Sequence, residues 1–388
     1  MIKWRAIFDK IEPLILSTEA IVITGMRRTG KTTVLKWAYE KIEHKNKIFI
    51  DLENPINRKI FSSENYDEIK RNLEFMGLKF TERAFIFIDE IQFIKTIPSV
   101  VKYFIDHYNA KFFLTGSASF YLKNLFTESL SGRKYIFELF PLSFKEFLHF
   151  KNKNFDINEN SPISQSTYSL LMPLYEEYLE FGGFPGVVLK EEIEEKQRAL
   201  DDIFSSFYQL EIIQLGDFKR NETIRDMILL LAQRVGTKIE IGKLSSELGV
   251  SNVTVKEYLS FLEGTYFIKL LKPFSRGKDI EIRKMPKVYL CDCGLLNRIS
   301  KLEKGRIFEN AIFQNLRLKG ELNYYQRKSG VEIDFILNRE KGYEVKLKPY
   351  ASDVSKLKKL AHDIGLKDFR IISKEYTSLE NTLFCFQI

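Results

Sequence analysis

The sequence predicts an α/β fold whose first 150 residues form a parallel sheet. Four short runs rich in Val, Ile and Phe end in glycine or polar residues, within 21–25, 47–52, 84–90 and 111–117. Fully apolar runs of this length are typical of strands buried on both faces, which is the position that strands of a parallel sheet occupy. A helical pattern that includes Val34, Leu35 and Ala38 follows the first run. Strand, loop and helix therefore follow one another at the start of the chain.

The first strand leads into a glycine-rich loop of the form G-x-x-x-x-G-K-T. Gly25 and Gly30 let the backbone N–H groups point inward, and Lys31 adds a positive charge where β- and γ-phosphates would lie. Thr32 offers a hydroxyl to Mg²⁺. We expect ATP to bind along the whole loop, which consists of Gly25, Met26, Arg27, Arg28, Thr29, Gly30, Lys31, Thr32 and Thr33.

Acidic and hydroxyl side chains end two later strands. Asp89 and Glu90 follow the run at 84–88, and Asp89 is predicted to hold magnesium while Glu90 polarises the water that attacks the γ-phosphate. Taken alone, such a pair is also typical of a solvated turn. Thr115 or Ser117, after the run at 111–114, is a candidate sensor of the γ-phosphate, and a capping serine in an ordinary turn is the alternative.

An arginine follows a flexible Ser-Gly pair at residues 130–133. Arg133 is predicted to reach a phosphate of its own chain or of a neighbouring chain, as arginine fingers do. The alternative is a surface arginine with no role in the site.

Residues 221–290 have the pattern of a winged helix. Helices are predicted at 221–235, 241–248 and 251–262, with Gly249 between the last two, and strands at 266–271 and 284–290. In the predicted recognition helix Lys256 is offset by Glu257 and Glu263, so we expect DNA contacts mainly between phosphates and the basic wing. Its basic residues are Lys272, Arg276, Lys278, Arg283 and Lys284. Winged helices also serve as lids or protein-binding modules, and that alternative stays open.

The last part of the chain carries a second charged pattern. A helix is predicted at 306–318 and strands at 331–337 and 343–347, which places Glu332 with Asp334, and Glu344 with Lys346, on single strand faces. This is the D…E-x-K arrangement of restriction-type nucleases. Asp334 and Glu344 would hold Mg²⁺ or Mn²⁺, Glu309 would complete the shell, and Lys346 would activate the attacking water. Alternating charge on a half-exposed sheet, or a domain that binds DNA without cleaving it, gives the same pattern.

Several of these motifs together resemble an archaeal and bacterial family of AAA-type ATPases. The resemblance is carried by residues 25–33, 87–91, 114–118, 130–133, 140–147 and 182–185. It implies a P-loop NTPase core at 1–150, a helical lid at 151–215, a winged helix at 216–300 and a restriction-endonuclease-like domain at 301–388.

Composition sets limits on location and partners. The net charge of +8 and the pI near 9.0 favour a polyanionic partner such as DNA. Three cysteines among 388 residues provide no disulfide framework, and Cys291-x-Cys293 is too sparse for a zinc site. No apolar run is long enough to span a bilayer, so we expect a cytoplasmic protein without a membrane partner.

Three hypotheses about function follow. The first is an ATPase whose nucleotide state positions the winged helix and the endonuclease-like domain on DNA. The second is an ATP-gated, metal-dependent DNA nuclease, and the third is a slow nucleotide switch that acts as a protein-binding scaffold. A homo-oligomer is compatible with each of them.

Overall fold

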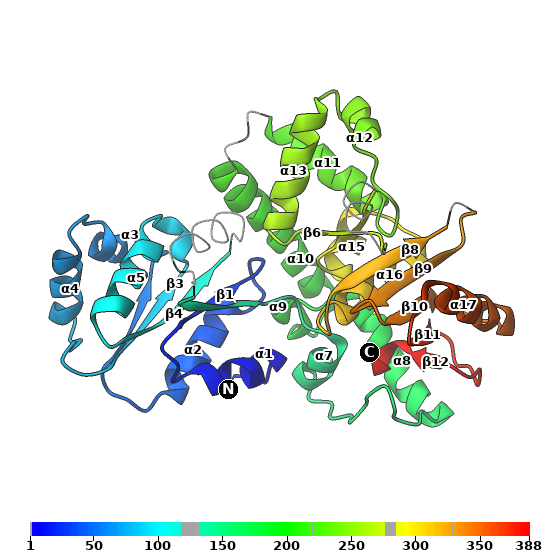
Figure 1. Ribbon diagram of the computed structural model, residues 1–388, viewed down its shortest axis with the longest axis horizontal. Coiled ribbons are helices and arrows are strands. Elements are labelled where there is room, and N and C mark those ends of the chain that lie inside the picture. The colour runs from blue at the N-terminus through cyan, green and yellow to red at the C-terminus, as the bar shows by residue number, and fades with distance from the viewer. Residues whose placement is uncertain are drawn as a thin grey trace. The chain divides into compact units, whose positions relative to one another are not determined.

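The computed structural model describes residues 2–117, 130, 132–216, 218, 220–275, 285–327 and 329–388. The chain divides into two compact units, Met1–Phe140 with Gly264–Tyr266, and Pro141–Glu263 with Phe267–Ile388 (Figure 1). The predicted wing residues Arg276, Lys278, Arg283 and Lys284 lie outside the described residues, as do residues 118 and 131 of the motifs. No helix in the described ranges has the length and apolar character needed to cross a membrane.

The first unit contains a five-stranded sheet in the order β2-β3-β4-β1-β5, in which all neighbouring strands are parallel. The strands are β1 (Ala20–Thr24), β2 (Lys47–Asp51), β3 (Ala84–Asp89), β4 (Ala110–Gly116) and β5 (Lys134–Glu138). The helices are α1 (Ala6–Ile11), α2 (Lys31–Lys41), α3 (Pro55–Arg58), α4 (Tyr66–Phe75) and α5 (Ile97–His107), with 3-10 turns at Glu12–Leu14, Lys59–Phe61 and Ile91–Phe93. The predicted parallel sheet is confirmed.

Helices cover both faces of this sheet. In β1, Val22 packs with α4 and α5 on one face, whereas Ile21 and Ile23 pack with α1 and α2 on the other. Because successive side chains of a strand point to opposite faces, the four apolar residues of β1 supply both cores at once. This packing holds the carboxyl ends of β1, β3 and β4 at one edge of the sheet.

The second unit begins with helices. They are α7 (Phe144–Phe150), α8 (Gln165–Phe181), α9 (Pro185–Val188), α10 (Ile193–Phe207), a π-helical segment (Tyr208–Leu215), α11 (Asn221–Gln233), α12 (Ile241–Leu248) and α13 (Asn252–Gly264). An antiparallel pair of strands, β6 (Ile268–Leu271) and β7 (Lys287–Leu290), and helices α15 (Cys293–Ile299) and α16 (Lys304–Leu316) follow. Ser251 caps α13 by accepting a hydrogen bond from the Thr254 N–H at 3.1 Å.

A mixed five-stranded sheet completes the second unit, in the order β12-β11-β10-β9-β8. Its elements are β8 (Leu322–Gln326), β9 (Glu332–Leu337), β10 (Lys341–Lys346), α17 (Ala351–Ile364), β11 (Asp368–Ser373), β12 (Thr382–Phe384) and a 3-10 turn (Cys385–Gln387). β9 pairs antiparallel with β10 and β8, and β11 pairs parallel with β10 and β12. Ile333, Ile336 and Ile371 pack with Leu357 and Leu360 of α17 in one core. The rings of Phe313 in α16 and Phe335 in β9 lie 6.0 Å apart.

Candidate nucleotide site and acidic cluster

The glycine-rich loop joins β1 to α2 at the carboxyl edge of the first sheet. Gly30 has a φ of 98°, and Arg28 has a φ of 64°. Both values lie in the left-handed region, which allows the tight curl of the loop. The buried Lys31 ammonium turns back over the loop and donates hydrogen bonds to the carbonyls of Gly25 and Met26, at 3.1 and 3.0 Å. The predicted loop residues are thus brought together.

Two close contacts fix this loop. A Cβ atom on Gly25 would lie 2.1 Å from the carbonyl oxygen of Leu139, so only glycine fits there. Arg5, which is buried, donates to the carbonyls of Thr29 at 3.0 Å and Phe140 at 2.8 Å. Sequence analysis did not find Arg5, because the position of an arginine 24 residues before its partner follows no local pattern.

Asp89 at the end of β3 lies close to hydroxyl groups from two other elements. Thr115 of β4 donates to the Asp89 carboxylate, and the hydroxyl of Thr32 at the start of α2 lies close enough to lower its pKa. Burial raises the pKa of Asp89, and the two hydroxyls oppose that rise. The predicted magnesium-binding pair, Thr32 and Asp89, therefore lies in one place.

Glu90 is held in an unusual backbone conformation, with a φ of 57°. Its N–H donates to Thr115 Oγ1 at 3.2 Å, and its carboxylate accepts from Gln92. Gln92 Nε2 also donates to Ser117 Oγ at 3.0 Å. Left-handed residues other than glycine are costly and gather at functional sites. Gln92, which the sequence analysis did not single out, thus links Glu90 to Ser117.

Arg133 lies at the amino ends of the strands, opposite the edge that carries the glycine-rich loop. Its carbonyl accepts from the N–H of Ala20 at 2.8 Å, at the amino end of β1, and its side chain donates to Asp106 Oδ1 at 2.6 Å. The loop begins at the other end of β1. The structure therefore does not bring Arg133 to the phosphate loop of its own chain, and a role at a neighbour's nucleotide stays a prediction.

Tyr266 belongs to the first unit although it follows α13 in sequence. Its hydroxyl forms a hydrogen bond with Thr24 Oγ1 at 2.6 Å and another with Glu138 Oε1 at 3.1 Å. Thr24 is the residue that precedes Gly25. Tyr266 has a φ of 64°, a strained value for a side chain of its size. Its contact with Thr24 spans 242 residues and leaves no trace in the local sequence.

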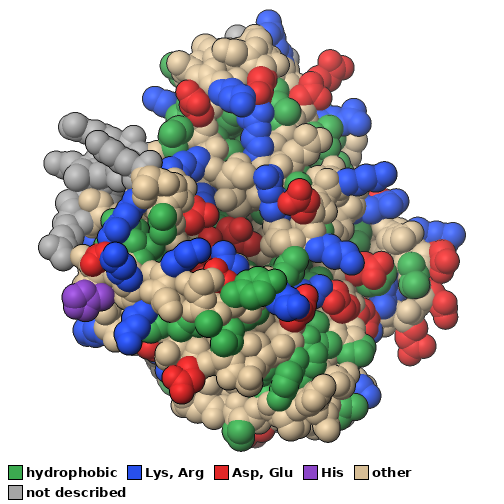
Figure 2. Space-filling model, turned by 90° about the vertical axis from the view of Figure 1, so that its right-hand side faces the viewer, with side chains coloured by type: hydrophobic (Ala, Val, Ile, Leu, Met, Phe, Trp, Pro, Cys, Tyr) green, Lys and Arg blue, Asp and Glu red, His purple; other side chains and the backbone are tan. Residues whose placement is uncertain are grey.

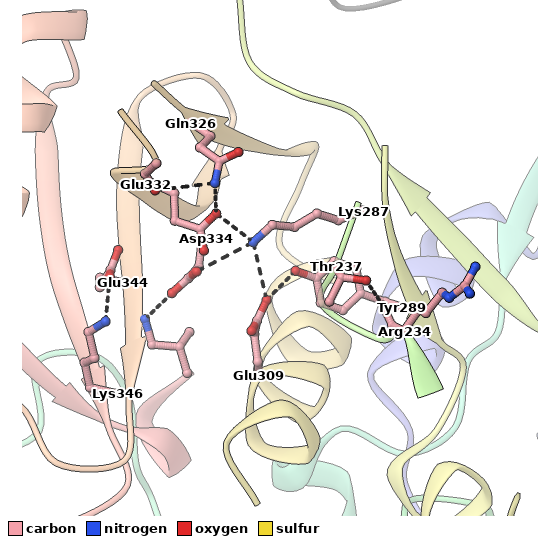
Figure 3. A network of polar contacts seen from close by, with 12 residues as sticks. Arg234, Thr237, Lys287, Tyr289, Glu309, Gln326, Glu332, Asp334, Glu344 and Lys346 are labelled. Atoms are coloured by element: carbon pink, nitrogen blue, oxygen red, sulfur yellow. Dashed lines mark hydrogen bonds and ion pairs between the residues drawn. The ribbon is translucent and has the colours of Figure 1, made fainter. Parts of the chain in front are cut away.

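Two of the predicted C-terminal metal ligands, Glu309 and Asp334, cluster with Glu332 around a lysine (Figure 3). The Lys287 ammonium of β7 lies 3.8 Å from Glu309 Oε1, 3.4 Å from Glu332 Oε2 and 3.8 Å from Asp334 Oδ1. Glu344 pairs instead with Lys346 at 2.8 Å. Burial and the charge of Asp334 raise the pKa of Glu344. We call Lys287, Glu309, Glu332 and Asp334 the acidic cluster.

The acidic cluster does not fit the predicted metal set. In the described part of the chain, no three His, Cys, Asp or Glu side chains are arranged to hold a metal ion. One Asp334 oxygen accepts from the Val345 N–H at 2.8 Å, and the ammonium of Lys287 faces the other. The set of Glu309, Asp334 and Glu344 is thus not supported as a metal centre, and the cation next to Glu309 and Asp334 is a lysine that the sequence analysis did not consider.

Comparison with known proteins decides the family. A family model for an AAA domain matches residues 17–148, and models for two domains of unknown function match residues 172–306 and 304–382. An uncharacterized protein of Haemophilus influenzae is 31% identical over 334 residues, which cover 82% of this chain and 79% of that protein. The chain belongs to an archaeal and bacterial family of AAA-type P-loop ATPases.

The AAA-type family includes archaeal relatives. An uncharacterized protein of Methanocaldococcus jannaschii is 28% identical over 386 residues, which cover 95% of this chain and 83% of that protein. The Aeropyrum pernix ORC1 protein, solved in complex with DNA, has a TM-score of 0.37 and 13% identity, and covers 77% of this chain and 93% of that chain. The resemblance and the fold class predicted from the sequence are confirmed, whereas the roles of individual residues stay predictions.

Proposed function

We propose that this AAA-type protein is a Mg²⁺-dependent ATPase whose turnover depends on Lys31, Thr32, Asp89 and Glu90. One observation carries the proposal: the Thr115 hydroxyl at the end of β4 donates to the buried Asp89, and the Thr32 hydroxyl at the start of α2 lies close enough to Asp89 to lower its pKa. This arrangement joins the phosphate loop to the acidic strand end, as phosphoryl-transfer sites require.

The donors present at this edge fit a triphosphate and its metal. The loop at 25–33 supplies backbone N–H groups and the Lys31 ammonium, and Thr32 with Asp89 supplies hard oxygen ligands of the kind that Mg²⁺ prefers. Bound Mg²⁺ would neutralise charge on the phosphates. Glu90 would orient and polarise the attacking water, and Gln92, which donates to its carboxylate, would fix the direction of that side chain.

Two variants test the proposal. Lys31→Ala should lose ATP binding, because the loop loses the positive charge that faces the phosphates. Glu90→Gln should keep ATP binding and lose turnover by about a hundredfold or more, because an amide is a poor proton acceptor. Equilibrium binding of a fluorescent ATP analogue and release of phosphate separate the two effects. Full turnover by Glu90→Gln would contradict the role assigned to Glu90. If the wild type hydrolyses ATP as slowly as Glu90→Gln does, the result would favour the hypothesis of a slow nucleotide switch.

We further propose that the nucleotide state is passed to the predicted winged helix and thence to DNA. Tyr266 supports this step, because it bonds to Thr24 beside the loop and lies in the chain directly between α13 and β6. On the face drawn in Figure 2, Lys and Arg side chains are interspersed with Asp and Glu. DNA contacts are therefore expected at the local basic wing and not across a whole basic face.

A further inference from the structure

The acidic cluster contains a cation that comes from outside the mixed sheet. Glu332 and Asp334 belong to β9 and Glu309 belongs to α16, whereas Lys287 begins β7, the second strand of the antiparallel pair. The ammonium lies between the three carboxylates in Figure 3, at 3.4 to 3.8 Å from an oxygen of each. Three acidic side chains from two elements thus converge on one nitrogen.

This lysine is fixed in place by its surroundings. Its side chain is only 4% exposed, and its ammonium lies 5.5 Å from the centre of the Tyr324 ring. Tyr289, two residues further along β7 and hence on the same strand face, donates to Glu309 Oε1 at 2.6 Å. β7 therefore contacts the cluster through an ammonium and a hydroxyl.

The charges explain why the lysine stays ionised. Burial lowers the pKa of Lys287, but Glu309, Asp334 and Glu332 outweigh it, and the pKa lies above its ordinary value. The three acidic side chains also need the charge of this ammonium, since buried acidic groups without a cation are strongly destabilising.

We propose that the Lys287 ammonium is the built-in cation of the acidic cluster and that it excludes a divalent metal from it. A metal ion bound by carboxylates requires oxygen atoms at about 2.0 to 2.6 Å, much closer than the present nitrogen-to-oxygen distances. It would also meet the positive charge of Lys287 across the same three side chains. Release of β7 would be needed before the carboxylates could close around a metal.

Metal binding by the whole 388-residue chain in the absence of nucleotide tests this inference. In calorimetry with Mn²⁺, the wild type and Asp334→Asn should give the same binding heat, because the acidic cluster of the wild type binds no metal. Lys287→Met, which keeps the length of the side chain and removes its charge, should bind Mn²⁺ at least about tenfold more tightly. Lys238→Met is the matched control, since the Lys238 ammonium lies 5.9 Å from the same Tyr324 ring, and it should behave as wild type.

A thermal-melting series decides the case in which Lys287→Met folds poorly. Mn²⁺ should raise the melting temperature of Lys287→Met and leave that of the wild type unchanged, and adding Glu309→Gln should restore part of the lost stability without metal. A wild-type Mn²⁺ site that Asp334→Asn abolishes, or Mn²⁺-dependent DNA cleavage lost in that variant, would overturn the inference. So would a Lys287→Met protein that neither Mn²⁺ nor Glu309→Gln stabilises. ATP hydrolysis plays no part in these readouts, so the ATPase proposal is tested separately.

Discussion

At the residue scale, Thr115 joins the two acidic residues of the nucleotide site. Its hydroxyl donates to the Asp89 carboxylate and accepts from the Glu90 N–H at 3.2 Å. One side chain therefore orients the proposed metal ligand and the backbone of the proposed base. This arrangement fits a positioning role, whereas the sequence predicted a sensor that contacts the γ-phosphate.

The substitution Thr115→Val tests whether the hydrogen bonds of the Thr115 hydroxyl, and not only the volume of its side chain, are needed for turnover. It keeps the volume but leaves Asp89 without a donor and the Glu90 N–H without an acceptor, so kcat should fall about tenfold or more. Thr115→Ser restores the hydroxyl and should recover most of the activity. Steady-state kinetics of both variants provide the measurement, and equal losses in Val and Ser would argue against the hydrogen bonds.

Other residues of the site show which contacts sequence reasoning can find. Lys31, Thr32 and Asp89 follow strands in recognisable motifs, so the sequence was sufficient to place them together. Arg5, Gln92 and Tyr266 carry no motif, and their contacts depend on backbone positions that exist only after folding. The role of Arg133 was left open between a phosphate of its own chain and one of a neighbouring chain, and the folded chain places Arg133 beside Ala20 at the amino end of β1.

At the element scale, the Gly-Gly-Phe-Pro segment is explained by packing. A Cβ atom on Gly182 would lie 2.0 Å from Asp292 Oδ1, and one on Gly183 would lie 2.3 Å from the carbonyl oxygen of Leu142. Asp292 caps α15 by accepting from the Leu295 N–H at 2.9 Å, and it accepts from the Gly183 N–H at 2.7 Å. Gly182 thus lets the end of α8 approach the start of α15, and Gly183 lets the same segment approach the backbone of Leu142.

Asp292 should make the second unit less stable as the pH rises through the mildly acidic range. Burial raises its pKa to about 6, although the N–H groups of Gly183, Leu295 and Gly294 oppose the rise. In the unfolded chain the pKa of an Asp is about 3.9, so the folded state holds the proton more tightly. The free energy of unfolding should therefore fall by about 3 kcal/mol as the pH rises from about 4 to about 6.

The variant Asp292→Asn cannot titrate at this position and should lack this part of the pH dependence. Urea unfolding of the variant and the wild type across that range is the measurement, followed through a probe in the second unit. Parallel curves for the two proteins would show that another group is responsible.

Most elements were predictable because their patterns are local. The strand at 84–88 and the helix at 241–248 agree with β3 and α12 almost to the residue. The order of the strands in each sheet was not predictable, because pairing depends on which faces of distant elements fit together. The acidic cluster shows the same limit, since Glu309 and Asp334 were grouped with Glu344, which pairs with Lys346, while Lys287 of β7 was missed.

At the scale of the whole molecule, the proposed DNA partner makes a prediction about salt. If the wing contacts about five phosphates, affinity for plasmid DNA should fall about a hundredfold or more from about 50 to about 200 mM salt. Lys272→Ala should reduce the slope of log affinity against log salt concentration by about one. Lys367→Ala is the control and should leave that slope unchanged, because Lys367 lies outside the wing and pairs with Glu340. Gel shifts over a salt series measure this, and affinity independent of salt would exclude phosphate-dominated binding.

The proposed ATPase requires that the loop at 25–33 binds ATP together with a magnesium ion held by Thr32 and Asp89. Calorimetric titration of Mg²⁺-ATP into the purified chain tests it most directly. We expect one saturable site in the wild type and none in Lys31→Ala. Absence of binding heat in the wild type, or the same site in Lys31→Ala, would contradict it.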